Sequence, residues 1–188
     1  MNKVTIDGRT IEVTEGNTIL SAAKQLGIEI PTLCWLKEIN DIGSCRMCVV
    51  EVEGEDGLLA ACNTQVRDGM VVKTVSPRIV KARRANMRAL LENHRTACTT
   101  CIRSGNCALQ SLSADLGLND ETASGTIEEF PWDGPASWDP TFPLQRDATK
   151  CIKCMRCVAE CSKVQYCSVW EGLNNGLIKD VVTSGDTI

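Results

Sequence analysis

The residues of this sequence that can do metal chemistry fall into three groups. Twelve of the 188 residues are cysteines and one is a histidine. Thiolate and imidazole are ligands of zinc and of iron–sulfur clusters. Three such groups in one short chain, with no other catalytic motif, predict an electron-transfer protein. The first, middle and third cysteine groups are Cys34, Cys45, Cys48 and Cys62; His94, Cys98, Cys101 and Cys107; and Cys151, Cys154, Cys157 and Cys161.

The first cysteine group has the spacing C-x10-C-x2-C-x13-C, one tight pair with two remote cysteines. A [2Fe–2S] cluster requires four thiolates, and four are present. Gly43 and Ser44 precede the tight pair, and such small residues let backbone N–H groups approach the sulfur atoms. A zinc site is the alternative, although zinc motifs usually contain two tight pairs.

The middle cysteine group has the spacing H-x3-C-x2-C-x5-C and contains the only histidine of the chain. A lone histidine is usually structural or exposed. Because Cys98 and Cys101 follow it closely, we interpret His94 as a metal ligand. Three cysteines and one histidine are also a common ligand set for zinc, so a zinc site is again the alternative.

The third cysteine group has the spacing C-x2-C-x2-C-x3-C, which is the run found in bacterial ferredoxins. Its first three thiolates suit one [4Fe–4S] cluster, whereas Cys161, expected where a helix starts, normally ligates a different cluster. Ser162 stands where a proline usually follows, and no second run is present. The fourth ligand stays open between Cys161, Cys167, a residue beyond the chain and a partner chain.

The first 75 residues predict a compact α+β unit of the β-grasp type. Asp7-Gly8 is a two-residue hairpin signal between strands at 4–6 and 11–13. A helix with an apolar face follows, with Asn17 or Thr18 as its N-cap and Gly27 at its end. Further strands are expected at 47–53, 58–61 and 71–72.

A longer helix is expected to begin at Ser76-Pro77, with serine as N-cap and proline in the first turn. Its basic residues are expected outside the apolar stripe, on a solvated face or, alternatively, on a surface that docks an acidic partner. A short helix should end at Gly117. Residues 125–143 should form an irregular cover over the cluster domains or, alternatively, a partner-binding loop. The stripe of the longer helix comprises Ile79, Val80, Met87, Leu90 and Leu91, and its basic residues are Lys81, Arg83, Arg84 and Arg88.

The composition of the chain argues against several classes of function. A net charge of −4 and a pI near 5.1 argue against general nucleic-acid binding. The first residues show no signal peptide, and no stretch of 18 apolar residues suggests a membrane span. We therefore expect a cytoplasmic protein without nucleic acid or membrane as partner. In that reducing compartment, metal ligation is favoured over disulfides.

Three stretches of the first 75 residues, PTLCW, GSCRMCVVEV and ACNT, resemble the [2Fe–2S] domain that opens the large iron–sulfur subunit of respiratory complex I. The same domain opens many iron-only hydrogenases and a small subunit of NAD-linked nickel–iron hydrogenases. In these families the H-x3-C-x2-C-x5-C pattern holds a [4Fe–4S] cluster through one imidazole, and all four positions match here. One neutral imidazole in place of a thiolate should raise the reduction potential.

The resemblance implies one [2Fe–2S] and two [4Fe–4S] clusters in a chain without catalytic residues of its own. It implies a β-grasp [2Fe–2S] domain at 1–76, a helical domain with one histidine and three cysteine ligands at 77–117, a connecting segment at 118–148 and a partial ferredoxin-like module at 149–188. The implied partners are a flavoprotein that handles NAD(P)H and a catalytic subunit, either a hydrogenase or a formate dehydrogenase. Ferredoxin would join them in an electron-bifurcating complex.

Two other functions stay open from the sequence. The chain could be the electron-relay region of a catalytic iron-only hydrogenase, whose catalytic domain would need further cysteine motifs. It could also be a zinc-stabilised binding scaffold, which would be colourless. No GxGxxG motif, P-loop or catalytic triad is visible, and an electron relay needs none of them.

Overall fold

The computed structural model describes residues 1–118, 148–175 and 178–183. Within these ranges a five-stranded sheet has the order β2-β1-β5-β3-β4, and a second sheet pairs β6 with β7. The predicted α+β class is confirmed. The strands are β1 (Asn2–Ile6), β2 (Arg9–Val13), β3 (Val49–Val52), β4 (Leu59–Ala60), β5 (Met70–Lys73), β6 (Trp170–Asn175) and β7 (Ile178–Thr183). The helices are α1 (Ile19–Gln25), α2 (Pro77–Glu92), α3 (Ala108–Asp115) and α4 (Arg156–Lys163), with 3-10 turns η1 (Cys98–Thr100) and η3 (Ala148–Lys150).

The N-terminal hairpin forms as expected. β1 and β2 pair antiparallel, with Ile6 opposite Arg9, so the turn consists of Asp7 and Gly8. Both turn residues have positive φ, +47° and +80°, as a type I′ hairpin turn requires. β1 also pairs parallel with β5, which in turn pairs antiparallel with β3. The predicted hairpin and the strands predicted at 47–53, 58–61 and 71–72 are therefore confirmed. β3 and β4 are shorter than the predicted ranges 47–53 and 58–61.

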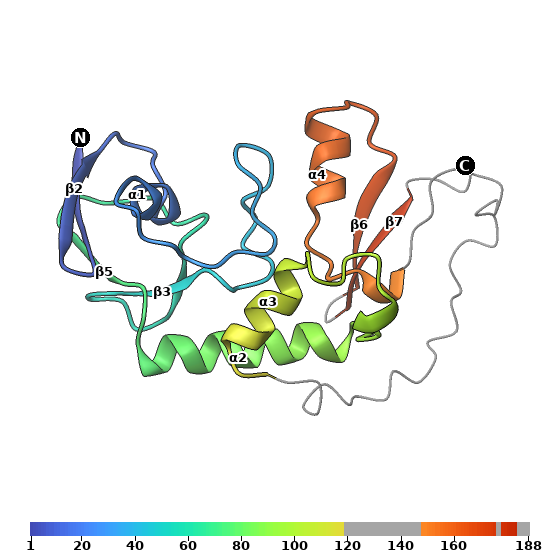
Figure 1. Ribbon diagram of the computed structural model, residues 1–188. Coiled ribbons are helices and arrows are strands. Elements are labelled where there is room, and N and C mark those ends of the chain that lie inside the picture. The colour runs from blue at the N-terminus through green and yellow to red at the C-terminus, as the bar shows by residue number, and fades with distance from the viewer. Residues whose placement is uncertain (119–147, 176–177, 184–188) are drawn as a thin grey trace.

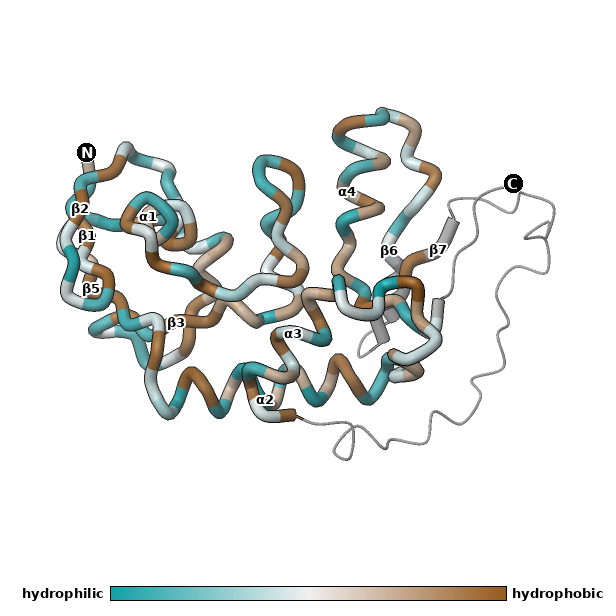
Figure 2. The backbone as a smooth tube through the Cα atoms, viewed as in Figure 1, coloured by the Kyte–Doolittle hydropathy of each residue, from teal (hydrophilic) through white to brown (hydrophobic). Residues whose placement is uncertain are grey.

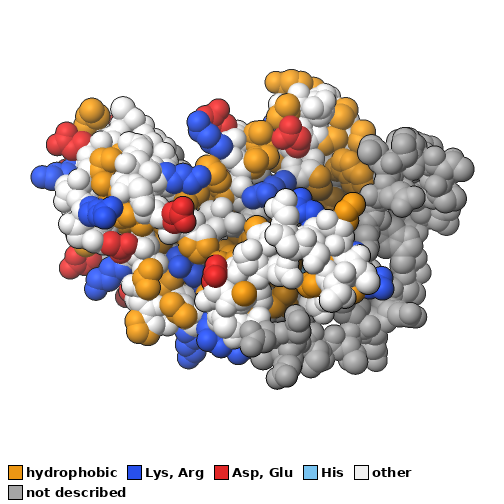
Figure 3. Space-filling view, viewed as in Figure 1, with side chains coloured by type: hydrophobic (Ala, Val, Ile, Leu, Met, Phe, Trp, Pro, Cys, Tyr) orange, Lys and Arg blue, Asp and Glu red, His pale blue; other side chains and the backbone are white. Residues whose placement is uncertain are grey.

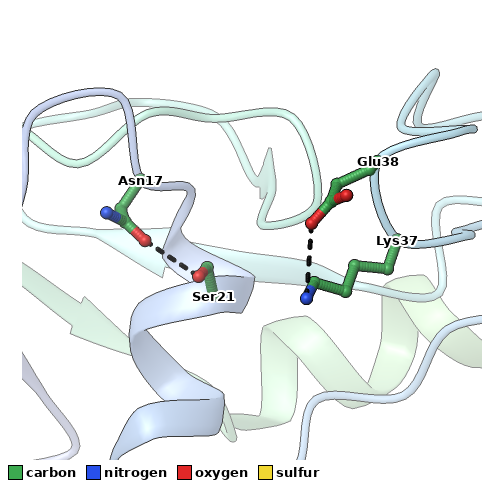
Figure 4. A network of polar contacts seen from close by, with 4 residues as sticks. All are labelled: Asn17, Ser21, Lys37 and Glu38. Carbon is green, nitrogen blue, oxygen red and sulfur yellow. Dashed lines mark hydrogen bonds and ion pairs between the residues drawn. The ribbon is translucent and has the colours of Figure 1, made fainter.

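Of the two predicted N-cap candidates for helix α1, the structure has Thr18 in that position. Thr18 is the N-cap, and its side chain accepts a hydrogen bond from the backbone N–H of Ser21 at 3.2 Å. The Ser21 hydroxyl donates to Asn17 Oδ1 at 2.9 Å (Figure 4). Gly27 ends the helix with φ +70°. Figure 4 also shows the Lys37–Glu38 ion pair, which is highly exposed and so contributes little to stability.

Helix α2 begins at the predicted Ser76-Pro77, and the Ser76 hydroxyl accepts from the N–H of Ile79 at 3.1 Å. Its buried row recurs every four residues and consists of Ile79, Arg83, Met87 and Leu91. The prediction for Arg83 was therefore wrong: this arginine is only 7% exposed, because backbone carbonyls in the fold accept its hydrogen bonds. The prediction for Val80 was also wrong, since that side chain is 37% exposed. Figure 2 shows brown and teal residues alternating along this helix.

Helix α2 links the two halves of the described structure. It starts below the five-stranded sheet and runs toward the part of the molecule that holds α4 and β6–β7, with α3 beside it (Figure 1). Helix α3 ends as predicted, with Gly117 at φ +64°. Figure 3 shows basic and acidic side chains interspersed over the visible face.

The C-terminal part differs from the sequence prediction in two respects. Helix α4 begins at Arg156, so Cys161 lies within the helix rather than at its start. β6 and β7 form an antiparallel hairpin from Trp170↔Thr183 to Asn175↔Ile178 that we did not predict. The Asn-Asn-Gly sequence at 174–176, with β-branched residues after it, is the signal that could have found it.

The irregular cover expected at 125–143 lies outside the described residues. None of the helices in the described ranges is long and apolar enough to cross a membrane.

Candidate metal centres

The fold brings the four thiols of the first cysteine group into one buried place. Cys34 lies in the loop after α1, Cys45 and Cys48 precede β3, and Cys62 follows β4. All four side chains are at most 5% exposed, and none forms a disulfide. The backbone N–H of Cys45 donates to Cys34 Sγ at 3.5 Å. Four cysteines that are spread over 29 positions of the sequence, with the strands β3 and β4 between the first and the last, thus share one site.

The four thiols are arranged as two hydrogen-bonded pairs. The bond with Cys34, followed by backbone N–H groups such as that of Met47, lowers the pKa of Cys45 to about 5 against the opposing effect of burial. The bond with Cys62 likewise lowers the pKa of Cys48 to about 7. The pKa of Cys34 and of Cys62 is raised, because each keeps the shared proton and burial disfavours its thiolate. In each pair one thiol thus ionises more readily than an ordinary cysteine, and metal binding would release the remaining protons.

This donor set fits a two-iron cluster. A [2Fe–2S] cluster takes two thiolates on each iron, which matches two pairs of thiols. A single zinc ion needs its ligands around one point. Across residues 1–118, 148–175 and 178–183, no three His, Cys, Asp or Glu side chains converge in that way.

Gly43 keeps the loop before Cys45 close to the segment after β4. Its φ is +63°, and a Cβ added there would lie 2.9 Å from Nδ2 of Asn63. A larger residue would be strained by its backbone conformation and by this contact. The small residue noted in the sequence therefore has a steric role at the first cysteine group.

The middle cysteine group lies on the connection between α2 and α3. His94 follows the C-cap of α2, Cys98 begins η1, and Cys107 is the N-cap of α3. The four side chains are partly buried, and Nδ1 of His94 is fully buried. The backbone N–H of Arg103 donates to Cys101 Sγ at 3.5 Å. Such N–H···S contacts favour thiolate ligands of a cluster.

The third cysteine group surrounds the start of α4. Lys153 and Met155 have positive φ, and the N–H of Lys153 donates to Cys151 Sγ at 3.4 Å. Cys161 lies beside Cys167, with 3.4 Å between their sulfur atoms, and accepts from the N–H of Val169 at 3.2 Å. Two of the candidates for the fourth ligand therefore lie next to each other.

The three cysteine groups meet at one apolar core, which we call the junction core. Met47, Met87 and Leu109 are buried in it, together with Cys34 and Cys45 of the first group. Cys107 of the middle group and Cys154 of the third group pack against it. All three candidate metal sites thus contact a single water-excluding region.

Two side chains that sequence reasoning missed join the first and third groups. Asn40 is buried, and its Nδ2 donates to the carbonyl oxygens of Cys34 at 2.7 Å and of Cys154 at 3.0 Å. Arg156 donates through Nη2 to the carbonyl of Trp35 at 2.8 Å. No local pattern marks either residue, because the bond of Asn40 to Cys154 and that of Arg156 to Trp35 each span more than a hundred residues of the chain.

The comparisons with known proteins define two iron–sulfur regions. Residues 1–77 match the family model of the 2Fe-2S iron–sulfur cluster binding domain. Residues 83–122 match that of the NADH-ubiquinone oxidoreductase-G iron–sulfur binding region. The five-stranded sheet with α1 is consistent with the first of these models. These two models support the prediction that this chain binds iron–sulfur clusters of the [2Fe–2S] and [4Fe–4S] kinds.

Particular relatives extend the likeness to almost the whole chain. The chain is 45% identical over 185 residues to NADP-reducing hydrogenase subunit HndD of Solidesulfovibrio fructosivorans. The matched region covers 94% of this chain and 30% of that relative. It is 37% identical over 168 residues to the NADH-ubiquinone oxidoreductase 75 kDa subunit of Reclinomonas americana, covering 87% of this chain and 23% of the relative. The chain thus spans less than a third of the length of these relatives.

A solved structure shows the same arrangement of elements. The crystal structure of an NAD+-reducing [NiFe]-hydrogenase in the H2-reduced state matches with a TM-score of 0.76 and 27% identity. The match covers 97% of this chain and 75% of the other. The resemblance to iron–sulfur electron-transfer subunits of hydrogenases and of complex I, predicted from the sequence, is therefore confirmed.

Proposed function

We propose that this chain relays electrons between a subunit that oxidises or reduces NAD(P)H at a flavin and a catalytic subunit, which we take to be a hydrogenase. The observation that carries the proposal is the meeting of all three cysteine groups at the junction core. Electron transfer needs redox centres held close together and shielded from water. Two relatives, an NADP-reducing hydrogenase subunit and an NADH-ubiquinone oxidoreductase subunit, have names that agree with these partners.

We assign each cysteine group to one cluster. The first group would hold a [2Fe–2S] cluster in a β-grasp domain at 1–76, and the middle group a [4Fe–4S] cluster in a helical domain at 77–117. The third group would hold a second [4Fe–4S] cluster at 149–188, with its fourth ligand from Cys161, Cys167 or outside this chain. When bound, such clusters accept and release single electrons.

The chain's own residues would orient and shield these centres. Burial excludes water from the thiols of the first group. Backbone N–H groups at Lys153 and Arg103 point to sulfur atoms of the third and middle groups. Asn40 links the backbone of Cys34 in the first group to that of Cys154 in the third group. These contacts are the means by which a protein tunes a cluster.

Iron and acid-labile sulfide in anaerobically purified protein test this proposal. We expect about ten irons and as many sulfides per chain, with distinct low-temperature EPR signals of [2Fe–2S] and [4Fe–4S] clusters after reduction. About six irons would mean that the third group is completed only by residues outside this chain. Zinc without sulfide would contradict the proposal and favour a zinc-stabilised scaffold.

Replacing His94 with cysteine tests the middle cluster. A thiolate adds negative charge, so the midpoint potential of one [4Fe–4S] signal should fall by on the order of 100 mV. In Rieske centres, two imidazoles in place of two thiolates raise the reduction potential by roughly several hundred mV, and here only one ligand changes. The measurement is an EPR-monitored redox titration. Asn93→Cys, an exposed neighbour, is the matched control and should leave every potential unchanged. An unchanged or higher potential in His94→Cys would contradict the ligand role of His94.

A further inference from the structure

Arg83 is a buried cation beside the first cysteine group. It lies in the buried row of α2 and is 7% exposed. Its Nη2 atom donates to the carbonyl of Val49 at 2.9 Å and to the carbonyl of Thr74 at 3.1 Å. Val49 directly follows Cys48 in the chain. The guanidinium therefore lies against the backbone that leads from a candidate cluster ligand into β3.

No carboxylate neutralises this arginine within the described residues. Ion pairs found there join Lys37 to Glu38 and Arg67 to Glu55. The carboxylate of Asp7 instead accepts two hydrogen bonds from Thr74. Nε of Arg83 is buried and has no hydrogen-bond partner among the described residues. A buried charge without a counter-ion is costly, so a negative group nearby has to account for it.

The negative group next to Arg83 is the first cysteine group. The hydrogen bond to the carbonyl of Val49, the residue after Cys48, places the guanidinium beside this group. Burial lowers the pKa of Arg83, and the negative charge of Cys48 opposes that shift. Four thiolates with two ferric irons and two sulfides carry net negative charge, and reduction adds one more. In a site of low dielectric, a fixed positive charge favours the reduced state.

We propose that Arg83 is a positioning residue that raises the reduction potential of the cluster in the first cysteine group. This inference rests on the proposed function, because it requires a [2Fe–2S] cluster at Cys34, Cys45, Cys48 and Cys62. Arginine suits the role because its guanidinium keeps its charge when buried and satisfies two carbonyls at once. The charge is then present in every redox state of the cluster.

The test compares charge removal at two arginines of the same helix. Arg83→Gln keeps an amide donor near Val49 and Thr74 but removes the charge, and Arg83→Lys keeps the charge. Arg88→Gln removes the same charge from an exposed position. An EPR-monitored redox titration of the purified full chain gives the midpoint potential of the [2Fe–2S] signal, with the [4Fe–4S] signals as internal references.

We expect the [2Fe–2S] potential to become more negative in Arg83→Gln, by several times the shift in Arg88→Gln, and to stay near the original value in Arg83→Lys. The [4Fe–4S] potentials should stay unchanged. Equal shifts in Arg83→Gln and Arg88→Gln would overturn the proposal, because they would report only the net charge of the protein. No shift in Arg83→Gln would overturn it as well.

A second uncharged variant covers the case in which Arg83→Gln does not assemble. Arg83→Met has similar length, and a buried ion is often replaced without loss of folding by an apolar residue of its size. If both variants lose the [2Fe–2S] signal and keep the [4Fe–4S] signals, Arg83 is required for assembly of the site and the tuning role is overturned. A parent protein without any [2Fe–2S] signal would overturn the proposed function itself.

Discussion

Replacing Cys48 with serine is expected to abolish the [2Fe–2S] signal and remove about two irons per chain, while both [4Fe–4S] signals persist. Cys48 is 1% exposed and forms one of the two thiol pairs with Cys62. A serine hydroxyl does not ionise near neutral pH, so it cannot replace a thiolate of lowered pKa. Iron analysis and EPR of the reduced protein provide the measurement.

The reciprocal variant Cys101→Ser serves as control for Cys48→Ser. It should remove one [4Fe–4S] signal and leave the [2Fe–2S] signal intact. Both substitutions are equally conservative, so the opposite outcomes would separate ligand loss from general destabilisation. Loss of a [4Fe–4S] signal in Cys48→Ser, with the [2Fe–2S] signal retained, would show that the first and middle groups are assigned to the wrong clusters.

Truncating Met87 to alanine should lower the free energy of unfolding by about 2–5 kcal/mol, as for other buried methionines. Met87 is fully buried in the junction core, where α2 packs against Cys34, Cys45 and Met47. A loss of this size corresponds to a melting temperature lower by roughly 5–15 °C for a chain of this length. Thermal unfolding of the iron-loaded protein measures it.

Val80→Ala is the matched control for Met87→Ala. Val80 lies on the same helix but is 37% exposed, so its truncation should change the free energy of unfolding by about 0.5 kcal/mol or less. Equal losses in the two variants would contradict the packing of α2 against the junction core. An unchanged melting temperature in Met87→Ala would contradict it more directly.

Features that depend on neighbours in the chain were predictable from the sequence. Asp7-Gly8 formed the expected hairpin turn, Ser76-Pro77 began α2, and Gly27 and Gly117 ended their helices. Turn and capping residues act within a few positions of themselves, so a short pattern contains all the information they need. The cysteine groups were recognised for the same reason, although their ligand roles stay predictions.

Features that depend on distant partners were decided by the tertiary structure. A charge pattern placed Arg83 on a solvated face, yet carbonyls of Val49 and Thr74 accept its hydrogen bonds and bury it. Asn40 joins Cys34 to Cys154, a residue 114 positions away. By itself the sequence indicated which residues are candidate metal ligands and where the turns fall. Only the packing of α2, α3 and the segment before α4 against the loops that hold Cys34 and Cys45 decided that the three groups share one core, because such contacts depend on the whole chain being folded.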